Sequence, residues 1–398
     1  MAIIFLIIMM SAIGFGLVLP AFLFAAENLG GGPEIATMIV ATYSVGQMIS
    51  TPIWGRLSDR YGRKPVLVIS LVGAMLSYIG LALATNLWML GLARALGGLM
   101  AGNFSTAMAY VSDVTPEHLR AKGMGIVGAA FSLGFIVGPA IGGLLSGPDA
   151  ATASLYWPGM AAAIMAGLTL VATLVFLKES LTPEQRQRAA DQPHQSVWQA
   201  TLRVFERPVI FRMILVGLAF VFVTGMFETI FPLWANQKLT WGPREVGWLF
   251  AYLGAIVAVV QGGLIGPLTR WFGEGPLVPT ATVLYALGLV IMAAAPSSGW
   301  VLFGITFTAV ASSLFNPAMS SLVSQQAGAE ERGLVLGVFQ SATWLGRSLG
   351  PVASGVLFGQ FGREAPLLVG AVLMLPCLWV VFSFLKRMRR QQTEVAAG

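Results

Sequence analysis

The sequence predicts an all-α membrane protein with twelve transmembrane helices in two six-helix bundles. Hydrophobic residues make up 56% of the 398 residues and charged residues only 10%, whereas a soluble domain carries about 25% charged residues. So few polar side chains cannot cover a water-facing surface, but a chain in lipid can turn apolar side chains outward. The 47 glycines and 21 prolines agree with this, because membrane helices tolerate both residues and use small side chains for close packing.

Other classes of protein fit the composition poorly. The single cysteine, Cys377, lies in an apolar run, so neither a disulfide framework nor a cysteine metal cluster can form. His118 and His194 are too few and too far apart for a zinc site, and we expect no metal and no cofactor. The net charge of +6 does not indicate nucleic-acid binding, since the basic residues cluster in short loops between apolar runs, which is a topology signal.

A helix needs about 20 apolar residues to cross a bilayer. The first apolar run has no basic region before it and no small-residue cleavage pattern at its end, so it is interpreted as a span and not as a signal peptide. Apolar stretches between polar or turn-rich breaks predict spans at 3–26, 34–54, 65–86, 88–112, 121–146, 155–177, 209–235, 245–266, 275–296, 299–325, 333–359 and 365–385.

The longest polar stretch divides these spans into six and six. The predicted organisation is a first bundle at 1–178, a cytoplasmic linker at 179–207, a second bundle at 208–390 and a C-terminal tail at 391–398.

The basic residues also predict the orientation in the membrane. If the N-terminus is cytoplasmic, most of the 23 Lys and Arg residues fall in cytoplasmic loops, in the linker or in the tail. Such an asymmetry favours a multi-pass protein of the inner, cytoplasmic membrane with both termini inside.

The loop after the second predicted span reads GRLSDRYGRKP from Gly55 to Pro65. Gly55 and Gly62 allow tight turns and close helix approach. Asp59 lies between the end of one helix and the start of the next, where a helix dipole can stabilise an anion, and the basic residues suit the anionic inner leaflet. A plain positive-inside loop is the alternative, but charge rules do not explain the spacing of glycine and aspartate. The loop resembles the signature G-x-L-x-D-R-x-G-R-K of the major facilitator superfamily at every fixed position.

Two further stretches carry this resemblance. The run RALGGLMAG from Arg94 to Gly102 resembles the arginine motif of the family, and GFIVGPAIGG from Gly134 to Gly143 resembles the G-x-x-x-G-P-x-x-G-G motif of its antiporter branch. Small residues four apart let helices meet closely, and Pro139 bends the span. Generic helix packing is the alternative for the second stretch; the resemblance itself favours export.

Weaker echoes at 266–273 and 346–355 indicate two repeated halves. Residues 11–147 resemble tetracycline/proton antiporters and related drug exporters, with the similarity carried by 58–67 and 110–116. Those antiporters have acidic residues in spans 1 and 3, and the matching positions here are Ser11 and Ser77. This departure calls tetracycline transport into question.

Ionisable residues at membrane depth are costly and therefore functional candidates. The resemblance implies that Arg94 takes part in proton transfer or tunes a nearby acid; a structural arginine bonded to helix carbonyls is the alternative. Glu228 precedes Pro232 in an apolar run and is interpreted as a proton carrier or cation site, or else as a residue of the outer interface. Arg347 is expected to pair across helices or with the cytoplasmic gate, and Glu27 to lie among the outer headgroups. Proton coupling or gating is assigned to Asp59, Arg63, Arg94, Asp113, Glu228 and Arg347.

The central substrate cavity is expected between the halves, near the midplane of the membrane. A mostly apolar pocket with few hydrogen-bonding groups suits hydrophobic or amphipathic compounds. The candidate lining residues are the uncharged polar or aromatic ones within spans, namely Tyr43, Gln47, Asn103, Phe104, Phe131, Gln261, Asn316, Gln340 and Trp344.

The predicted function is proton-coupled efflux of lipophilic or amphipathic small molecules by alternating access, typical of multidrug efflux and antibiotic resistance. We expect a monomer in the lipid bilayer, with protons as the coupling ion. The alternative is a major facilitator transporter for one metabolite, either a sugar or organic-ion symporter or an exporter. Such a transporter would normally need more polar groups in the cavity. An enzyme is not expected, since no nucleophile–base pair, metal cluster or phosphate loop can be assembled from the loops.

Overall fold

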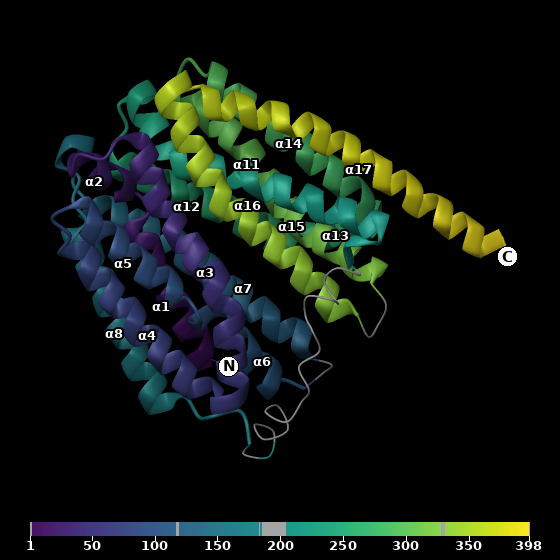
Figure 1. Ribbon diagram of the computed structural model, residues 1–398, viewed down its shortest axis with the longest axis horizontal. Coiled ribbons are helices and arrows are strands. Elements are labelled where there is room, and N and C mark those ends of the chain that lie inside the picture. Colours follow the sequence, from purple (N-terminus) through teal and green to yellow (C-terminus); the bar gives the residue numbers. More distant parts are fainter. Residues whose placement is uncertain (1, 117–118, 183, 185–203, 328–330, 398) are drawn as a thin grey trace. The chain divides into compact units, whose positions relative to one another are not determined.

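The computed structural model describes residues 2–116, 119–182, 184, 204–327 and 331–397 (Figure 1). All regular secondary structure in these ranges is helical, which confirms the predicted all-α fold class. The chain forms two compact units. Unit 1 contains 1–193 and 231–258, and unit 2 contains 194–230 and 259–398. Residues 231–258 therefore join the first unit, and much of the predicted linker at 179–207 lies outside the described residues, so the predicted bundle boundaries stay a prediction.

The helices of unit 1 follow the first six predicted spans. They are α1 (Ala2–Val18), α2 (Phe22–Asn28), α3 (Pro33–Tyr61), α4 (Arg63–Ala82), α5 (Leu87–Leu99), α6 (Asn103–Val114), α7 (Arg120–Leu145), the short 3₁₀ helix η2 (Ala150–Thr152) and α8 (Tyr156–Phe176). The end of α11 and almost all of α12, from Pro243 to Ala258, belong to the same unit.

Two of these predicted spans are interrupted, which the sequence analysis did not anticipate. The span at 3–26 breaks at residues 19–21, where Pro20 has no N–H to continue the helix. The span at 88–112 breaks at 100–102, where a Cβ on Gly102 would lie 2.4 Å from the ring of Trp54. The Trp54 indole Nε1 donates a hydrogen bond of 2.7 Å to the carbonyl of Leu99, so the ring satisfies a carbonyl at the end of α5.

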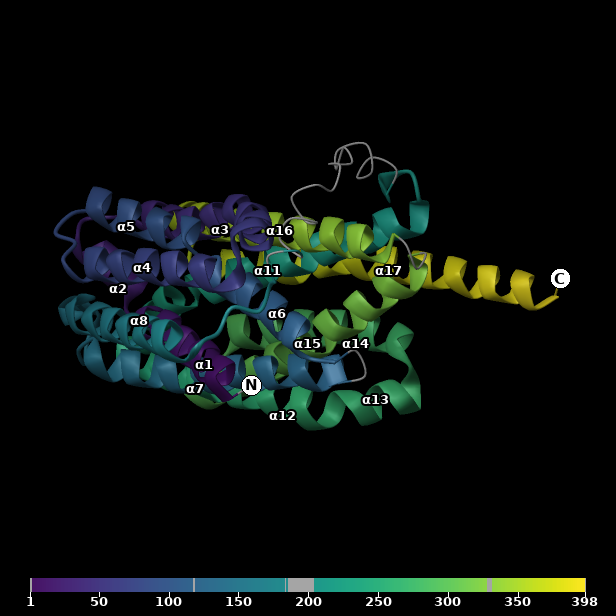
Figure 2. The same ribbon diagram turned by 90° about the horizontal axis from the view of Figure 1, so that it is seen from below.

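Close backbone contacts hold unit 1 together. Helix α4 lies between α5 and α8 (Figure 2), and α1 packs against α7 and α8. A Cβ on Gly142 would lie 2.1 Å from the carbonyl oxygen of Leu17, and one on Gly134 would lie 2.6 Å from that of Met9. The motif glycines of α7 thus let its backbone touch α1, because no larger residue fits there.

Unit 2 consists of the remaining helices, in which α14 packs against both α15 and α17 (Figure 1). They are α11 (Pro208–Leu239) as far as Ile230, the π-helical turn η3 (Val260–Leu264) that follows α12 (Pro243–Val259), α13 (Ile265–Phe272), α14 (Glu274–Ala294), α15 (Ser298–Gln326), α16 (Arg332–Phe361) and α17 (Ala365–Ala397). Its core contains Phe220 stacked on Phe315, with ring centroids 3.7 Å apart, and Tyr285 at 5.0 Å from Phe220.

Helix α17 continues through Ala397, so the described residues of the predicted C-terminal tail at 391–398 are helical. The stretch following the last apolar turn is rich in Lys, Arg, Gln, Glu and Ala, and these residues have high helix propensity.

Among the described residues, nine helical segments are long and apolar enough to cross a membrane. The predicted spans at 34–54, 88–112 and 333–359 also coincide with helices, namely α3, the pair α5 and α6, and α16, but they are not among the nine. Helices α5 and α6 are short because of the break, whereas α3 and α16 carry more polar side chains. The multi-pass helical architecture is confirmed, and the count of twelve stays a prediction.

Candidate functional site

A tight turn joins α3 to α4 and places the signature loop. Helix α3 ends at Tyr61, and Gly62 adopts φ 106° before α4 begins at Arg63. Only glycine adopts such a positive φ without steric cost. The N–H of Gly62 donates to the carbonyl of Ser58 over 3.1 Å, so the turn holds the last residues of α3 beside the first of α4.

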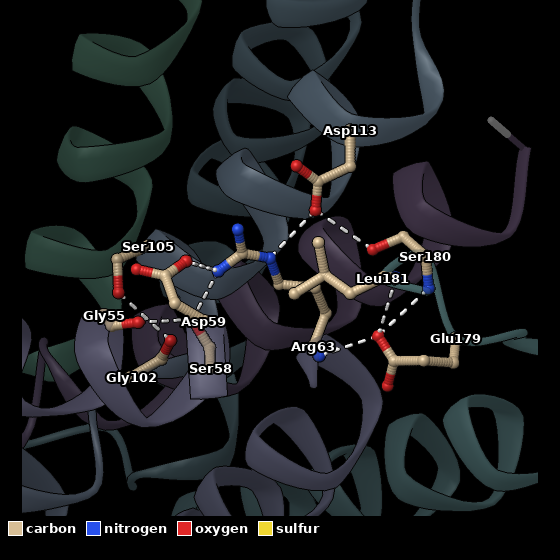
Figure 3. Close-up of polar contacts among 10 residues, drawn as sticks. All are labelled: Gly55, Ser58, Asp59, Arg63, Gly102, Ser105, Asp113, Glu179, Ser180 and Leu181. Atoms are coloured by element: carbon tan, nitrogen blue, oxygen red, sulfur yellow. Dashed lines mark hydrogen bonds and ion pairs between the residues drawn. The ribbon is translucent and has the colours of Figure 1, made fainter. Parts of the chain in front are cut away.

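Arg63 is the centre of a polar cluster at this turn (Figure 3). Its Nη1 lies 2.6 Å from Oδ1 of Asp59, and its Nε donates over 2.9 Å to Oδ2 of Asp113. Nη1 also donates over 2.6 Å to the hydroxyl of Ser58. The Arg63 side chain is 9% exposed, against 23% for Asp113 and 52% for Asp59. The bond to Asp113 is therefore the better shielded of the two ion pairs.

Glu179, just after α8, caps the N-terminus of α4. Its carboxylate accepts hydrogen bonds from the backbone N–H of Arg63 over 2.8 Å and of Lys64 over 3.0 Å. Helix N-termini have unpaired N–H groups and a positive dipole end, so an anion is stabilised there. The hydroxyl of Ser180 donates to Oδ2 of Asp113 over 3.0 Å, which ties this segment to α6 as well.

The structure therefore brings together Asp59, Arg63 and Asp113, which the sequence analysis singled out. It adds Ser58 and Glu179, which the sequence analysis missed. The available signal for Glu179 was an acidic residue directly after the apolar run at 155–177. Together the residues form a joint between α3, α4, α6 and the segment after α8, and its role in gating stays a prediction.

A second charged pair lies within unit 2. Nη2 of Arg347 in α16 lies 2.9 Å from Oε2 of Glu228 in α11. The side chains are 41% and 32% exposed, respectively. Glycines create this approach: a Cβ on Gly350 would lie 2.5 Å from the carbonyl oxygen of Phe222, and one on Gly346 equally close to that of Leu218. The echo motif of α16 thus packs its glycine face on α11 and places Arg347 opposite Glu228.

Arg94 lies in α5, where it is 3% exposed. Its guanidinium carbon is 4.6 Å from the ring centroid of Tyr43, so the structure places a predicted coupling residue beside a predicted cavity residue. Of the two serines that replace acids of the resembling antiporters, Ser77 donates to the carbonyl of Ala93 over 2.8 Å. The hydroxyl of Ser11 is buried, with no hydrogen-bond partner among the described residues.

The other predicted cavity residues are divided between the units. Exposed side chains are Phe131 in unit 1 and Gln261, Asn316 and Gln340 in unit 2, whereas Tyr43, Gln47, Asn103 and Trp344 are partly buried. The side chain of Phe104 lies outside the described residues, as do His118 and His194. A shared cavity stays a prediction. In the described part of the chain, no group of three or more His, Cys, Asp or Glu side chains could hold a metal.

The nine long apolar helical segments among the described residues indicate a multi-pass α-helical membrane protein. The sequence profile of the Major Facilitator Superfamily matches residues 4–280 and 236–397. The chain therefore belongs to this superfamily, which is a family of membrane transporters and not of enzymes, as the signature loop predicted.

Relatives with described functions include drug-resistance proteins. The chain is 29% identical to the class C tetracycline resistance protein of Escherichia coli over 380 residues, which cover 93% of each chain. It is also 29% identical to multidrug resistance protein 2 of Bacillus subtilis, over 88% of this chain and 86% of the relative. The crystal structure of the human organic anion transporter MFSD10 is similar in fold, with a TM-score of 0.70, 23% identity and coverage of 96% and 98%.

Proposed function

We propose that the protein exports lipophilic or amphipathic small molecules across the cytoplasmic membrane in exchange for protons, by alternating access. Relatives similar over most of their length are named for tetracycline and multidrug resistance, which supports efflux. The observation that carries proton coupling is the ion pair between Glu228 and Arg347, which joins α11 to α16. Protons serve as the coupling ion, no cofactor takes part, and the monomer works with both termini in the cytoplasm.

Glu228 supplies the exchangeable proton in this proposal. When its carboxylate is ionised, the attraction to Arg347 holds α11 against α16. A proton on Glu228 removes that attraction and leaves the guanidinium without its charged partner, so the contact between the two helices weakens. Charge pairs of this kind convert protonation into a shift between conformations, because the two states differ in interaction free energy.

The Arg63 cluster has a structural role in this proposal. Its ion pairs and the Glu179 cap fasten three helices and the segment after α8 at one point. The positive-inside rule predicts that the loop between α3 and α4, which contains this cluster, faces the cytoplasm. The cluster is proposed to keep these elements together as one rigid body while the transporter changes state.

The proposal is tested by dye accumulation in cells that express the protein. Wild-type cells are expected to accumulate less of a neutral fluorescent lipophilic dye than control cells, and a protonophore is expected to erase the difference. Glu228→Gln removes the proposed proton carrier at nearly constant size and is expected to lose export. Glu206→Gln, an exposed glutamate just before α11, is the matched control. Unchanged accumulation across a broad compound panel, or full export by Glu228→Gln, would contradict the proposal.

A further inference from the structure

Arg94 carries a positive charge in the interior of unit 1, and no described residue supplies a charged partner. It is 3% exposed, and its Nε has no hydrogen-bond partner among the described residues. A buried ion loses its hydration, and native proteins compensate such charges with opposite charges and hydrogen bonds. This arginine therefore requires an explanation that the helix packing alone does not provide.

Aromatic rings from three helices surround the guanidinium. Its central carbon lies 4.6 Å from the ring centroid of Tyr43 in α3, 4.8 Å from that of Phe22 in α2 and 5.7 Å from that of Phe15 in α1. We call these three residues the aromatic cage. The faces of aromatic rings attract cations, so the cage offsets part of the cost of burying the charge. It does not neutralise that charge.

Two other arginines of the described structure have the kind of partner that is not found there for Arg94. Arg63, which is also buried, contacts two carboxylates, and the half-exposed Arg347 contacts one. In the ranges that the structure describes, no carboxylate lies within 4.0 Å of Arg94. Glu27, on the same helix as Phe22, is not paired with Arg94. Among the described residues, Tyr43 and Tyr78 are the ionisable side chains that interact electrostatically with Arg94.

We propose that the missing anion is the transported compound: Arg94 binds the negatively charged group of an aromatic amphipathic substrate, such as a carboxylate. A guanidinium presents a planar fork of N–H donors that matches a carboxylate, and the rings beside it suit an aromatic body. Phe15 and Tyr43 are only partly buried, unlike Phe22, so the ligand approaches on their side. This inference rests on the proposed function and names anionic aromatic amphipathic compounds as one class among its substrates.

Equilibrium binding to the purified protein in detergent tests the inference. The probes are pyrenebutyric acid, which is ionised at pH 7, and its primary amide, which has nearly the same size but no charge. The wild type is expected to bind the acid at least 10-fold more tightly than the amide. Arg94→Gln is expected to lower the affinity for the acid to that for the amide, while the affinity for the amide stays the same.

Two further variants separate charge from folding. Arg94→Lys keeps the charge without the planar fork, and it is expected to retain an intermediate preference for the acid. Arg244→Gln, which alters an exposed arginine, is expected to bind like the wild type. Equal affinity of the wild type for acid and amide would overturn the inference without any variant, so the test does not depend on the folding of Arg94→Gln. An undiminished acid preference in Arg94→Gln would overturn it as well.

The binding assay uses neither a membrane nor a proton gradient, so its failure differs from failure of the proposed function. If the wild type exports a neutral dye but does not prefer the acid, only the assignment of Arg94 is overturned. If it prefers the acid but exports nothing, the anion site is supported and the efflux function is overturned.

Discussion

The ion pairs of Arg63 give a quantitative prediction, because its two acidic partners differ in exposure. Asp113→Asn weakens a bond of 2.9 Å between side chains that are 23% and 9% exposed. Hydrogen bonds to charged groups contribute about 1.5–3 kcal/mol, and the partial exposure of Asp113 places the expected loss near the lower end, at about 1.5 kcal/mol. Asp59→Asn affects a carboxylate that is 52% exposed, and exposed ion pairs contribute only about 0.2–1 kcal/mol.

These free energies translate into shifts of the unfolding temperature. A change of about 1 kcal/mol lowers Tm by roughly 2–4 °C for a folding unit of about 150–250 residues. Asp113→Asn is therefore expected to lower Tm by about 3–6 °C, and Asp59→Asn by roughly 0.4–4 °C.

The assay is thermal unfolding of the purified variants in one detergent at pH 7. In the double variant with Arg63→Gln, Asp113→Asn should cost much less than it does alone, because its partner is already gone. Two results would refute this account of the cluster. One is a larger decrease in Tm for Asp59→Asn than for Asp113→Asn, and the other is an Asp113→Asn variant as stable as the wild type.

Three other predictions concern packing, capping and topology. Gly142→Ala places a Cβ 2.1 Å from a backbone carbonyl of α1 and is expected to lower the free energy of unfolding by about 1–3 kcal/mol. The control is Gly125→Ala, which lies in open space on the same helix. Equal stability of the two variants would contradict the packing argument. Glu179→Gln removes the anion from the N-terminus of α4 and is expected to lower stability by about 0.3–1 kcal/mol, less than Asp113→Asn; a larger loss would mean that the carboxylate does more than cap. Tyr61→Cys introduces a thiol at an exposed position, whereas the native Cys377 is buried. The new thiol is expected to react with an impermeant maleimide in inverted vesicles but not in intact cells, and labelling of intact cells would contradict the proposed topology.

The sequence predicted the helices well, because the length of an apolar run is a local property. It did not predict the break at 100–102, since residues 88–112 are apolar on both sides of it. That break depends on a tertiary contact, in which the ring of Trp54 occupies the space beside Gly102 and bonds to Leu99. The break at 19–21 had a local signal in Pro20, but prolines also occur inside intact membrane helices such as α7 and α11.

The candidate sites were predictable as residues and not as contacts. Glu228 and Arg347 were both singled out for their charge at membrane depth, but they are 119 positions apart, and only the folded chain shows that they pair. The same holds for Glu179, which lies 116 positions from the backbone N–H of Arg63 that it caps. Burial cannot be read from residue types either. Only the folded chain shows that no carboxylate among the described residues lies within 4.0 Å of Arg94.

Transport by the purified protein in lipid vesicles tests the central claim most directly. The vesicles have an acidic lumen, so that protons leaving through the protein drive a neutral fluorescent dye inward, and protein-free vesicles measure passive entry. Wild-type vesicles are predicted to concentrate the dye only while the pH gradient lasts, and Glu228→Gln vesicles are predicted to fill no further than protein-free ones. Equal accumulation with and without the gradient, or full concentration by Glu228→Gln, would contradict proton-coupled efflux through the Glu228–Arg347 pair.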